Sequence, residues 1–547
     1  MNYNSKKQSA GERRAGEGWT GRRPRIEVMS DLSGGYNAVT YLLDRNVAAG
    51  RGGKIVFKDP VSEITYGELQ AQTRRLANLL RRLGVRREER VAMMMLDTID
   101  FPIVFLGSIR AGIVPVPLNT LLTSEQYAYV LADCRARVLF ISDALLPVVK
   151  DVLGRLPDLE HVVVSGTNAP DSSGHPHLWL RDELANESDQ FETVATHPDE
   201  PAFWLYSSGS TGMPKGVRHL HSNLEATAET YAKQVLGIRE DDVGLSAAKL
   251  FFAYGLGNAL TFPMSVGATT ILNPERPTPQ VMFELIRKHD PSIFFGVPTL
   301  FAAMLNDDAF KSEPRTKRLR VCTSAGEALP ELVGQSWQQR FGVDILDGVG
   351  STELLHIFLS NAPGDIKYGT SGKPVPGYSV RLVNDAGADV ADGEVGELLV
   401  NAPSAGEGYW NQRSKSRQTF EGGWTRTGDK YTRDAEGRYT YCGRSDDMFK
   451  VSGIWVSPFE VESALITHPS VAEAAVVPAE DAEGLLKPKA FVVLKQGASV
   501  SDLNGALKEH VKQKIGPWKY PRWIEVVESL PKTATGKIQR FKLRENP

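Results

Sequence analysis

The chain has 547 residues, of which 41% are hydrophobic and 24% are charged, and its formal net charge is −3. A chain of this length and composition forms several globular domains, which excludes a wholly disordered, collagen-like or coiled-coil protein. The balanced charge gives no reason to expect nucleic acid as the main partner.

The cysteines Cys134, Cys322 and Cys442 lie far apart, so the sequence predicts neither a disulfide framework nor a paired-cysteine metal site. We therefore expect a reducing compartment, the cytoplasm. The most apolar stretch, residues 101–118, contains Arg110 and is typical of a buried helix that leads into a strand. We expect no membrane span.

Residues 1–30 form a basic segment with few apolar side chains. Within residues 1–25, seven Lys and Arg side chains stand against Glu12 and Glu17. The apolar stretch of a signal peptide is missing. This composition favours a disordered tail over a nucleic-acid-binding arm.

From about residue 38, apolar runs of strand length alternate with segments of helical periodicity. The same alternation resumes from Asp241 to Leu346, and it predicts an α/β fold with largely parallel sheets. The predicted helices are 76–83, 103–111 and 145–153, and the predicted strands are 90–96, 113–117, 137–142 and 161–165.

After about residue 365 the pattern becomes richer in strands, and residues 443–453 are polar and turn-like, as expected at a domain boundary. The remaining residues suffice for a small α+β domain. We predict a tail at 1–30, a large domain at 31–445 and a small domain at 446–547. The predicted strands are 379–384, 396–401, 438–442, 472–477, 489–494 and 523–527, and the predicted helices are 458–466 and 501–515.

The strongest local signal is the segment 206–216 (YSSGSTGMPKG), which follows an apolar run. Glycines let backbone N–H groups converge on an anion, while the hydroxyls add donors and Lys215 adds charge. The segment is not a Walker A loop, because Pro214 precedes the lysine and Gly216 follows it. We favour phosphate binding over the alternative, a flexible surface turn.

Four further segments follow in order: Gly350-Ser-Thr-Glu353, Thr427-Gly-Asp429, residues 441–447 (YCGRSDD) and residues 531–537 (PKTATGK). With the loop at 206–216, they resemble the motifs of the adenylate-forming superfamily, which includes acyl-CoA synthetases, luciferases and the adenylation domains of peptide synthetases. The resemblance implies a large domain that binds ATP and an acyl group, a small mobile C-terminal domain, and a requirement for ATP, Mg²⁺ and coenzyme A.

By this resemblance, Glu353 binds Mg²⁺ and Thr352 donates to the α-phosphate, roles that suit a hard oxygen ligand and a hydroxyl. Taken alone, Ser-Thr-Glu would be a helix N-cap with an acid in the first turn. Asp429 is expected to accept the ribose hydroxyls, and Arg444 to bind ribose or phosphate. Taken alone, Asp429 would be a turn aspartate and Arg444 would be part of a surface ion pair.

The resemblance makes Lys537 the mobile cation that stabilises the acid carboxylate and the α-phosphate as they approach. By itself it would be an ordinary solvated lysine. Asp446 occupies the hinge position, and Ser452 and Gly453 are expected along the route of the CoA thiol.

Most members of the superfamily carry an aromatic residue just before the second motif, where adenine stacks, but here that position is Val349. We expect adenine to pack elsewhere, with the loop 326–329 as the candidate. The predicted nucleotide- and CoA-binding residues are Ser207, Ser208, Gly209, Ser210, Thr211, Gly212, Lys215, Gly326, Glu327, Asp347, Asp429, Arg444, Ser452 and Gly453, and the predicted catalytic residues are Lys537, Thr352 and Glu353.

The expected acyl pocket involves residues 249–258 (KLFFAYGLGN) and 354–358 (LLHIF). The first stretch has no carboxylate to pair with an ammonium group, which argues against an amino acid substrate. Residues 250–263, 350–360 and 530–544 resemble benzoate–CoA ligases. That resemblance implies an aryl pocket lined by Phe252, Ala253, Tyr254, Gly326 and His356. We expect His356 also to donate to a ring substituent; the alternative is a core histidine with a satisfied hydrogen bond.

The implied reaction joins benzoate to the α-phosphate of ATP, which gives benzoyl-AMP and pyrophosphate, and then transfers the acyl group to CoA. Four alternatives stay open: a ligase for a hydroxy-, amino- or halobenzoate, loading of an aryl acid onto a separate carrier protein, a luciferase-like enzyme, and an inactive nucleotide-binding protein. A homodimer is the default expectation.

Overall fold

The computed structural model describes residues 35–166, 176–207, 213–310, 316–445, 447–451, 454–481, 485–495, 497–498, 503–516, 519–532 and 538–544. The tail at 1–30 lies outside these ranges, as do Ser208, Gly209, Ser210, Thr211, Gly212, Asp446, Ser452, Gly453 and Lys537.

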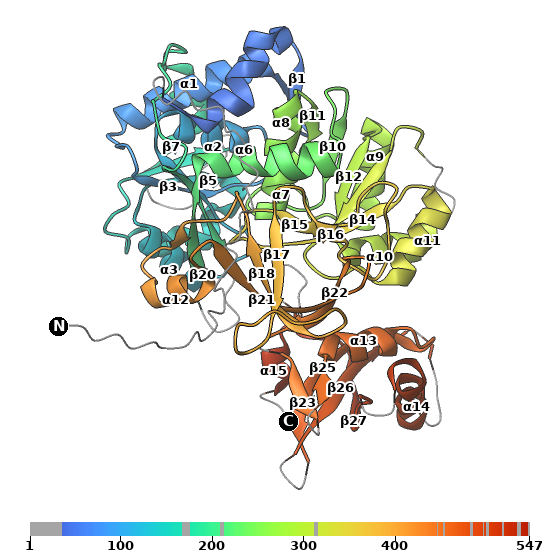
Figure 1. Ribbon diagram of the computed structural model, residues 1–547. Helices are drawn as coiled ribbons and strands as arrows, with labels where there is room; N and C mark the ends of the chain where they lie inside the picture. Colours follow the sequence, from blue (N-terminus) through green and yellow to red (C-terminus); the bar gives the residue numbers. More distant parts are fainter. Residues whose placement is uncertain are drawn as a thin grey trace, which may run out of the picture.

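A five-stranded parallel sheet in the order β4-β3-β5-β6-β7 forms one part of the large N-terminal region (Figure 1). Side chains alternate across it: Val91 and Met93 face one core, and Ala92 and Met94 face the other. Its strands are β3 (Arg90–Met94), β4 (Val114–Pro117), β5 (Ala136–Ser142), β6 (His161–Ser165) and β7 (Leu178–Trp179).

Helices cover both faces of this sheet, and the first of them begins at a capping box between Thr65 and Glu68. The stretch 101–118 is a buried helix followed by a strand, as predicted, and Arg110 pairs with Asp44 (2.7 Å). In the part of the chain that the structure describes, no helix has the length and apolarity needed to cross a membrane. The helices are α1 (Tyr66–Arg82), α2 (Asp100–Arg110), α3 (Ser124–Cys134), α4 (Leu146–Leu153) and α5 (Leu180–Ala185), with the short turns η1 (Thr40–Asp44), η2 (Val47–Arg51) and η3 (Asp143–Leu145).

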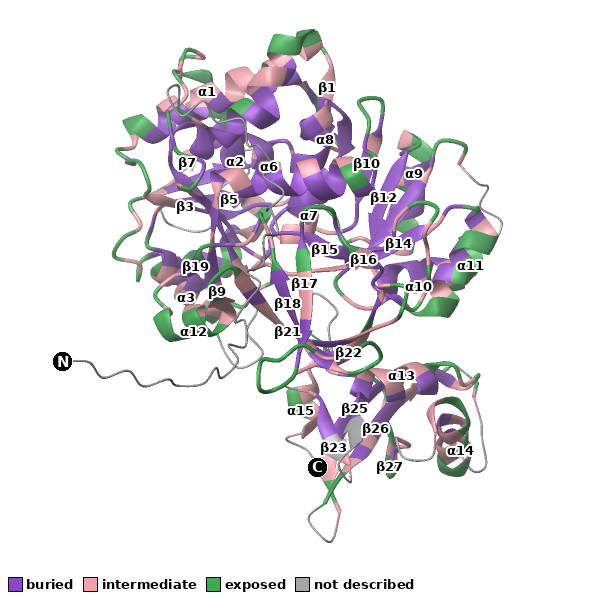
Figure 2. Cartoon of the chain, viewed as in Figure 1, coloured by how far each residue is buried: buried purple, intermediate pink, exposed green. Residues whose placement is uncertain are grey.

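A nine-stranded sheet lies next to it, in the order β16-β15-β14-β13-β12-β10-β11-β1-β2. Its middle strands pair in parallel and are buried (purple in Figure 2), whereas β2, β15 and β16 pair antiparallel at the two ends. Because parallel strands end at one edge, the loops after β10, β12, β13 and β14 gather there. The strands are β1 (Ile55–Lys58), β2 (Glu63–Thr65), β10 (Val243–Ser246), β11 (Thr269–Ile271), β12 (Ile293–Gly296), β13 (Val321–Ser324), β14 (Ile345–Gly350), β15 (Ile357–Ser360) and β16 (Lys373–Pro374).

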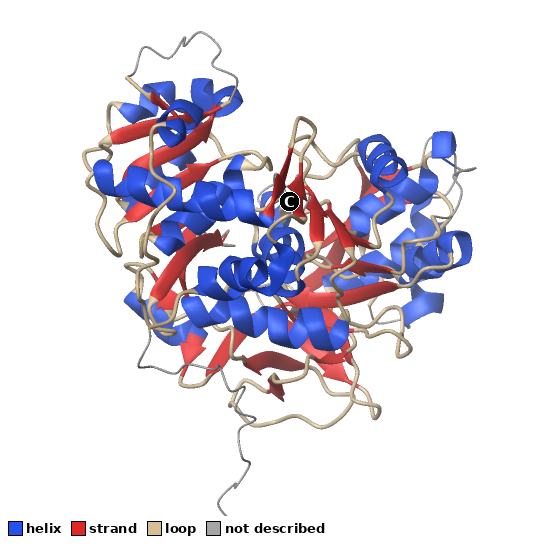
Figure 3. Cartoon of the chain, turned by 90° about the horizontal axis from the view of Figure 1, so that it is seen from above, coloured by secondary structure: helices blue, strands red, loops and turns tan. Residues whose placement is uncertain are grey.

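Helices flank the sheets on both sides in the view from above (Figure 3). One face of the nine-stranded sheet packs on an aromatic cluster around Trp337, and the other joins the main core. The helices and helical turns are α6 (His221–Thr227), η4 (Ala228–Val235), α7 (Ala253–Leu256), η5 (Gly257–Thr261), α8 (Phe262–Val266), α9 (Pro279–His289), α10 (Pro298–Asn306), η6 (Asp308–Phe310) and α11 (Glu331–Phe341).

Two antiparallel sheets complete this region, and the second of them confirms the predicted strand-rich texture after residue 365. The first is the hairpin β8–β9 with β19 along its edge, and the second joins β17, β18, β20, β21 and β22. The elements are β8 (Pro201–Ser207), β9 (Lys215–Leu220), β17 (Ser379–Val383), β18 (Gly396–Asn401), β19 (Gly408–Tyr409), α12 (Arg413–Thr419), β20 (Phe420–Glu421), β21 (Trp424–Arg433) and β22 (Tyr439–Arg444).

The C-terminal residues form a smaller unit below β22 in Figure 1, with a hydrophobic cluster of its own. The expectation that residues 443–453 are turn-like is partly wrong, since β22 extends to Arg444 and β23 pairs with β24. The boundary at residue 445 stays a prediction. The elements are β23 (Phe449–Val451), β24 (Ile454–Val456), α13 (Pro458–Ile466), β25 (Val471–Glu480), β26 (Leu486–Leu494), α14 (Leu503–Ile515), β27 (Trp523–Val526) and α15 (Arg540–Arg544).

Candidate functional site

The carboxyl edge of the nine-stranded sheet gathers most of the described candidate residues. Tyr254 lies in α7, beyond the end of β10, Gly326 follows β13, and Glu353 follows β14. In open parallel sheets, ligands bind in the crevice outside this edge. The fold therefore brings together residues that are about a hundred positions apart in the sequence.

The hydroxyl-rich segment closes the β8–β9 hairpin. Ser207 and Lys215 are register partners at the end of the hairpin that the loop joins, so they hold the two ends of the loop side by side. Ser208 to Gly212 lie outside the described residues. The strand pair fixes the two described ends of this segment, which suits a binding loop better than a free surface turn.

Tyr409 connects this hairpin to the second motif. It lies in β19, opposite Val217 of β9, and its ring lies 4.7 Å from the Lys215 Nζ. Its hydroxyl donates to Glu353 Oε1 at 2.8 Å. Burial, and then the charge of Glu353, raise the pKa of Tyr409, so the phenol stays a donor. Sequence reasoning missed Tyr409, because no motif or spacing marks it.

Thr352 and Glu353 occupy a turn and not the start of a helix. The Leu354 N–H is held by Ser351, Leu355 takes φ +66°, and the chain then enters β15. The N-cap alternative is therefore wrong. The Glu353 carbonyl accepts from the Gly406 N–H at 2.8 Å, which ties the turn to the segment before β19.

Asp429 and Arg444 face each other across β21 and β22. They are register partners, and Arg444 Nη1 lies 3.1 Å from Asp429 Oδ1 and 3.0 Å from the Thr427 carbonyl. Asp429 is therefore a strand residue and not a turn aspartate. The Asp429 side chain is 14% exposed and that of Arg444 is 41% exposed, so the pair lies at the surface of this sheet.

Asp347 is buried within β14. Its Oδ2 accepts from the Leu329 N–H at 3.3 Å, which ties it to the loop after β13, and its Oδ1 has no partner among the described residues. Burial raises the pKa of this carboxyl. Gly326 in the same loop has φ +95° and open space where a Cβ would point, and Glu327 follows it. Val349 is half-buried and packs on the main core.

The predicted acyl residues surround α7 and η5. Tyr254 is anchored where β12 and β13 end, since its hydroxyl lies 2.6 Å from Thr323 Oγ1 and donates to the Gly296 carbonyl at 3.2 Å. Phe252 and Ala253 immediately precede it and are half-buried. Phe252 packs against the ring of Phe251 at 4.4 Å.

His356 lies among three aromatic rings, with ring centroids 4.5 Å from Phe262, 5.3 Å from Tyr231 and 5.5 Å from Tyr254. Burial lowers its pKa to about 3, so the ring is neutral at pH 7. Gly257 makes room for it, because a Cβ at that position would lie 2.4 Å from His356 Cδ2.

The hydrogen bonds of His356 fix its tautomer. Its Nε2 lies 3.3 Å from the Tyr254 carbonyl and 3.2 Å from Asn258 Oδ1, and both atoms are acceptors. Nε2 therefore carries the proton, and Nδ1, buried and without a partner among the described residues, is an acceptor. The expectation that His356 donates to a ring substituent does not fit this geometry; it can accept from one.

Comparison with known proteins identifies the family of this chain. Residues 44–410 match the family model described as AMP-binding enzyme, and residues 460–537 match the model described as AMP-binding enzyme C-terminal domain. The chain is 56% identical to the 4-hydroxybenzoate–CoA/benzoate–CoA ligase of Rhodopseudomonas palustris, with 93% of this chain and 94% of that protein covered. It is 57% identical to the benzoate–CoA ligase of Thauera aromatica, with 93% and 96% covered.

The crystal structure of a benzoate CoA ligase from Burkholderia xenovorans LB400 superposes with a TM-score of 0.85 at 50% identity, over 93% of this chain and 100% of that one. These matches confirm the predicted fold of a large N-terminal α/β domain with a small C-terminal domain. They also confirm the resemblance on which the site was predicted. The chain belongs to the AMP-binding enzyme family.

Proposed function

We propose that this enzyme is an AMP-forming acid–thiol ligase that converts benzoate, ATP and CoA to benzoyl-CoA, AMP and pyrophosphate. The observation that carries the proposal is the buried aromatic cluster around His356, in which the rings of Phe262, Tyr231 and Tyr254 surround a neutral imidazole and would suit an aromatic acid. The names of the ligases from Rhodopseudomonas palustris and Thauera aromatica support it.

Glu353 is our candidate ligand for Mg²⁺. Among the residues that the structure describes, no group of three or more His, Cys, Asp or Glu side chains could hold a metal by itself. One carboxylate nevertheless suits Mg²⁺, which usually keeps water and substrate phosphates as its remaining ligands. The bound ion would neutralise part of the triphosphate charge. Lys215, the hydroxyl loop and Thr352 would bind the phosphates beside it.

The acid would enter between Tyr254 and Gly326, with its ring towards His356 and its carboxylate towards the turn that carries Thr352. Attack on the α-phosphate brings two anions together, so a cation is needed there, and we assign that role to Lys537. Asp429 and Arg444 would hold the ribose. The Asp347 carboxyl and the loop at Gly326 and Glu327 would hold the base.

A carboxylate is a poor electrophile, whereas AMP is a good leaving group, which explains why activation precedes transfer. We propose that the small domain then turns about Asp446 and brings Ser452 and Gly453 to the route of the CoA thiol. The turn also removes Lys537 from the approach that the thiol needs. The cytoplasmic location and the homodimer stay predictions.

A second candidate substrate class is a benzoate that bears a hydroxyl or amino group. The unpartnered Nδ1 of His356 favours it, because a ring donor would satisfy that buried acceptor. A site built to bind a hydroxyl rejects the analogue that lacks it by about 10⁴-fold, whereas an apolar pocket discriminates by only about 100-fold.

The experiment is a panel of benzoate, 2-amino-, 3-hydroxy-, 4-hydroxy- and 4-chlorobenzoate, with phenylalanine and octanoate as controls. AMP release is measured with and without CoA, and ATP–pyrophosphate exchange reports the first step alone. We expect exchange with benzoate and CoA-dependent AMP release. No exchange with any aryl acid would overturn the proposal, and a preference of about 10⁴-fold for one donor-bearing acid would favour the second class.

A further inference from the structure

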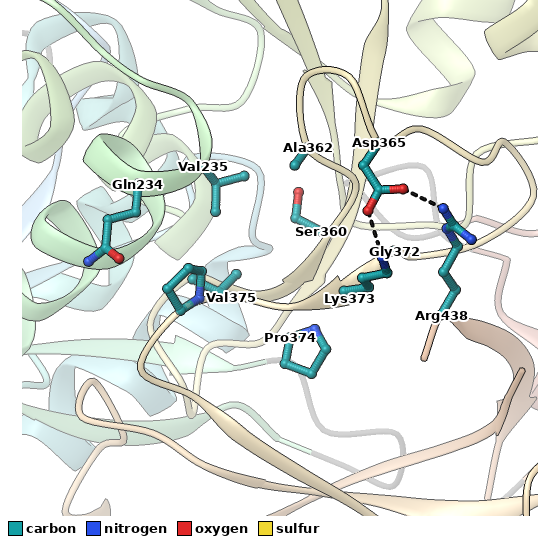
Figure 4. Close-up of a pocket in the computed structure, with 11 residues that line it drawn as sticks. Gln234, Val235, Ser360, Ala362, Asp365, Gly372, Lys373, Pro374, Val375 and Arg438 are labelled. Atoms are coloured by element: carbon teal, nitrogen blue, oxygen red, sulfur yellow. Dashed lines mark hydrogen bonds and ion pairs between the residues drawn. The ribbon is translucent and has the colours of Figure 1, made fainter. Parts of the chain in front are cut away.

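A cavity of about 170 Å³ lies between the end of η4 and the β15–β16 edge (Figure 4). Gln234 and Val235 line it on the helical side, and Ser360, Ala362 and Val375 line it on the other. Both bordering elements are also close to His356, since Tyr231 of η4 packs on the His356 ring and β15 begins at Ile357.

The charged residues of the cavity satisfy one another. Asp365 pairs with Lys373 at 2.7 Å and with Arg438, as the dashed lines in Figure 4 show. Asp365 and Lys373 are 40% and 43% exposed, so this cluster faces solvent. The other walls are mainly apolar side chains, so an apolar group suits the cavity better than an ion.

Tyr231 connects the helical wall of this cavity with the ring of His356. It precedes Val235 by four residues in η4, is fully buried, and has its ring centroid 5.3 Å from that of His356. Burial raises the pKa of Tyr231, and the nearby Ser360 hydroxyl offsets part of that rise. The ring of Tyr231 thus meets His356, and Val235, about one helical turn later, lines the cavity.

We propose that Tyr231 closes the far end of the aryl pocket and sets the length of acid that the enzyme accepts. A shorter side chain at this position joins the pocket to the cavity, which then admits a benzoate with a para alkyl chain. This inference rests on the proposed function and names a specificity residue for it.

The size of the cavity sets the expected effect. An apolar cavity of about 150 Å³ can hold a benzene molecule, so the space beyond Tyr231 is large enough for a butyl chain. Each methylene that leaves water favours binding by about fourfold. If only half of the butyl group is buried, the preference for 4-butylbenzoate over benzoate rises by at least about tenfold.

The test compares Tyr231→Leu with Tyr231→Phe, which keeps the ring and removes only the hydroxyl. The quantity measured is the ratio of kcat/KM for 4-butylbenzoate to that for benzoate, from AMP release in the presence of CoA. We expect the ratio to rise at least tenfold in Y231L and to change less than twofold in Y231F. A second substitution, Ala362→Phe, fills the cavity from its other wall and should cancel the gain in Y231L.

Thermal unfolding verifies that Y231L is folded, and Tyr231→Met replaces it if it is not. An unchanged ratio in the folded variant overturns the inference, as does a gain that survives Ala362→Phe. If the unmodified enzyme activates no aryl acid, the proposed function fails and this inference with it. If the unmodified enzyme activates benzoate but the ratio of kcat/KM values does not change in the folded variant, this inference alone is refuted.

Discussion

We expect the hydroxyl of Tyr409 to raise kcat/KM of the first half-reaction about tenfold. Tyr409→Phe removes the 2.8 Å hydrogen bond to Glu353 but keeps the ring over which Lys215 lies. A hydrogen bond to a charged group contributes ~1.5–3 kcal/mol. Glu353 is only half-buried, so water can replace part of this bond and the lower value applies. A loss of ~1.4 kcal/mol is tenfold in rate.

The assay is ATP–pyrophosphate exchange with benzoate, together with the Mg²⁺ concentration that gives half-maximal exchange. We expect kcat/KM to fall about tenfold and more Mg²⁺ to be needed, because Glu353 is less firmly positioned. Tyr127→Phe is the matched control, since its hydroxyl donates to the Asn119 carbonyl at 2.7 Å, away from the site. An equal fall in the control, or an unchanged Mg²⁺ requirement in Tyr409→Phe, would refute the role assigned to this hydroxyl.

Three further outcomes test other parts of the argument. Lys537→Ala should abolish benzoyl-AMP formation and spare thioester formation from supplied benzoyl-AMP; equal loss of both steps would contradict the assigned role. Gly257→Ala should raise the KM for benzoate at least fivefold, because its Cβ would displace His356 at 2.4 Å, whereas Gly53→Ala, with no neighbour within 4 Å, should not. Burial raises the pKa of Asp97 to about 6, above its value of about 3.9 in an unfolded chain, so folding takes up a proton. The stability of the unmodified enzyme relative to Asp97→Asn should therefore rise by up to about 3 kcal/mol as the pH falls from 7 to 4, and urea midpoints that keep a constant difference would exclude this.

Local sequence patterns predicted many of the helices and strands, because hydrophobic periodicity and apolar runs are contained within each element. The helix predicted at 458–466 has those bounds in α13, and the predicted run at 161–165 is β6. The strands within 443–453 were not predictable in the same way. Residues there are polar, and β23 exists because residues 449–451 pair with 454–456. Pairing between neighbours overrides a composition typical of turns.

The candidate site likewise contains residues that local motifs identify and residues that only the fold brings in. Motifs identified Lys215, Glu353 and Asp429, because each lies in a segment with a characteristic pattern. Tyr409 has no such pattern, and it enters the site because β19 pairs with β9. The direction of the hydrogen bonds at His356 was also beyond sequence reasoning. It depends on a carbonyl and an amide that lie about a hundred residues away.

The turn between Glu353 and His356 connects the two ends of the candidate site. Glu353 and His356 are three residues apart, yet Glu353 receives a hydroxyl donor at a half-exposed edge and His356 is neutral and buried among aromatic rings. The reversal occurs at Leu355, whose φ of +66° is costly for a residue with a branched side chain. Burial of that side chain helps to offset the cost. Because the proposed phosphate end and the proposed acyl end share this turn, we expect a change in its geometry to alter both the rate of adenylate formation and the choice of acid.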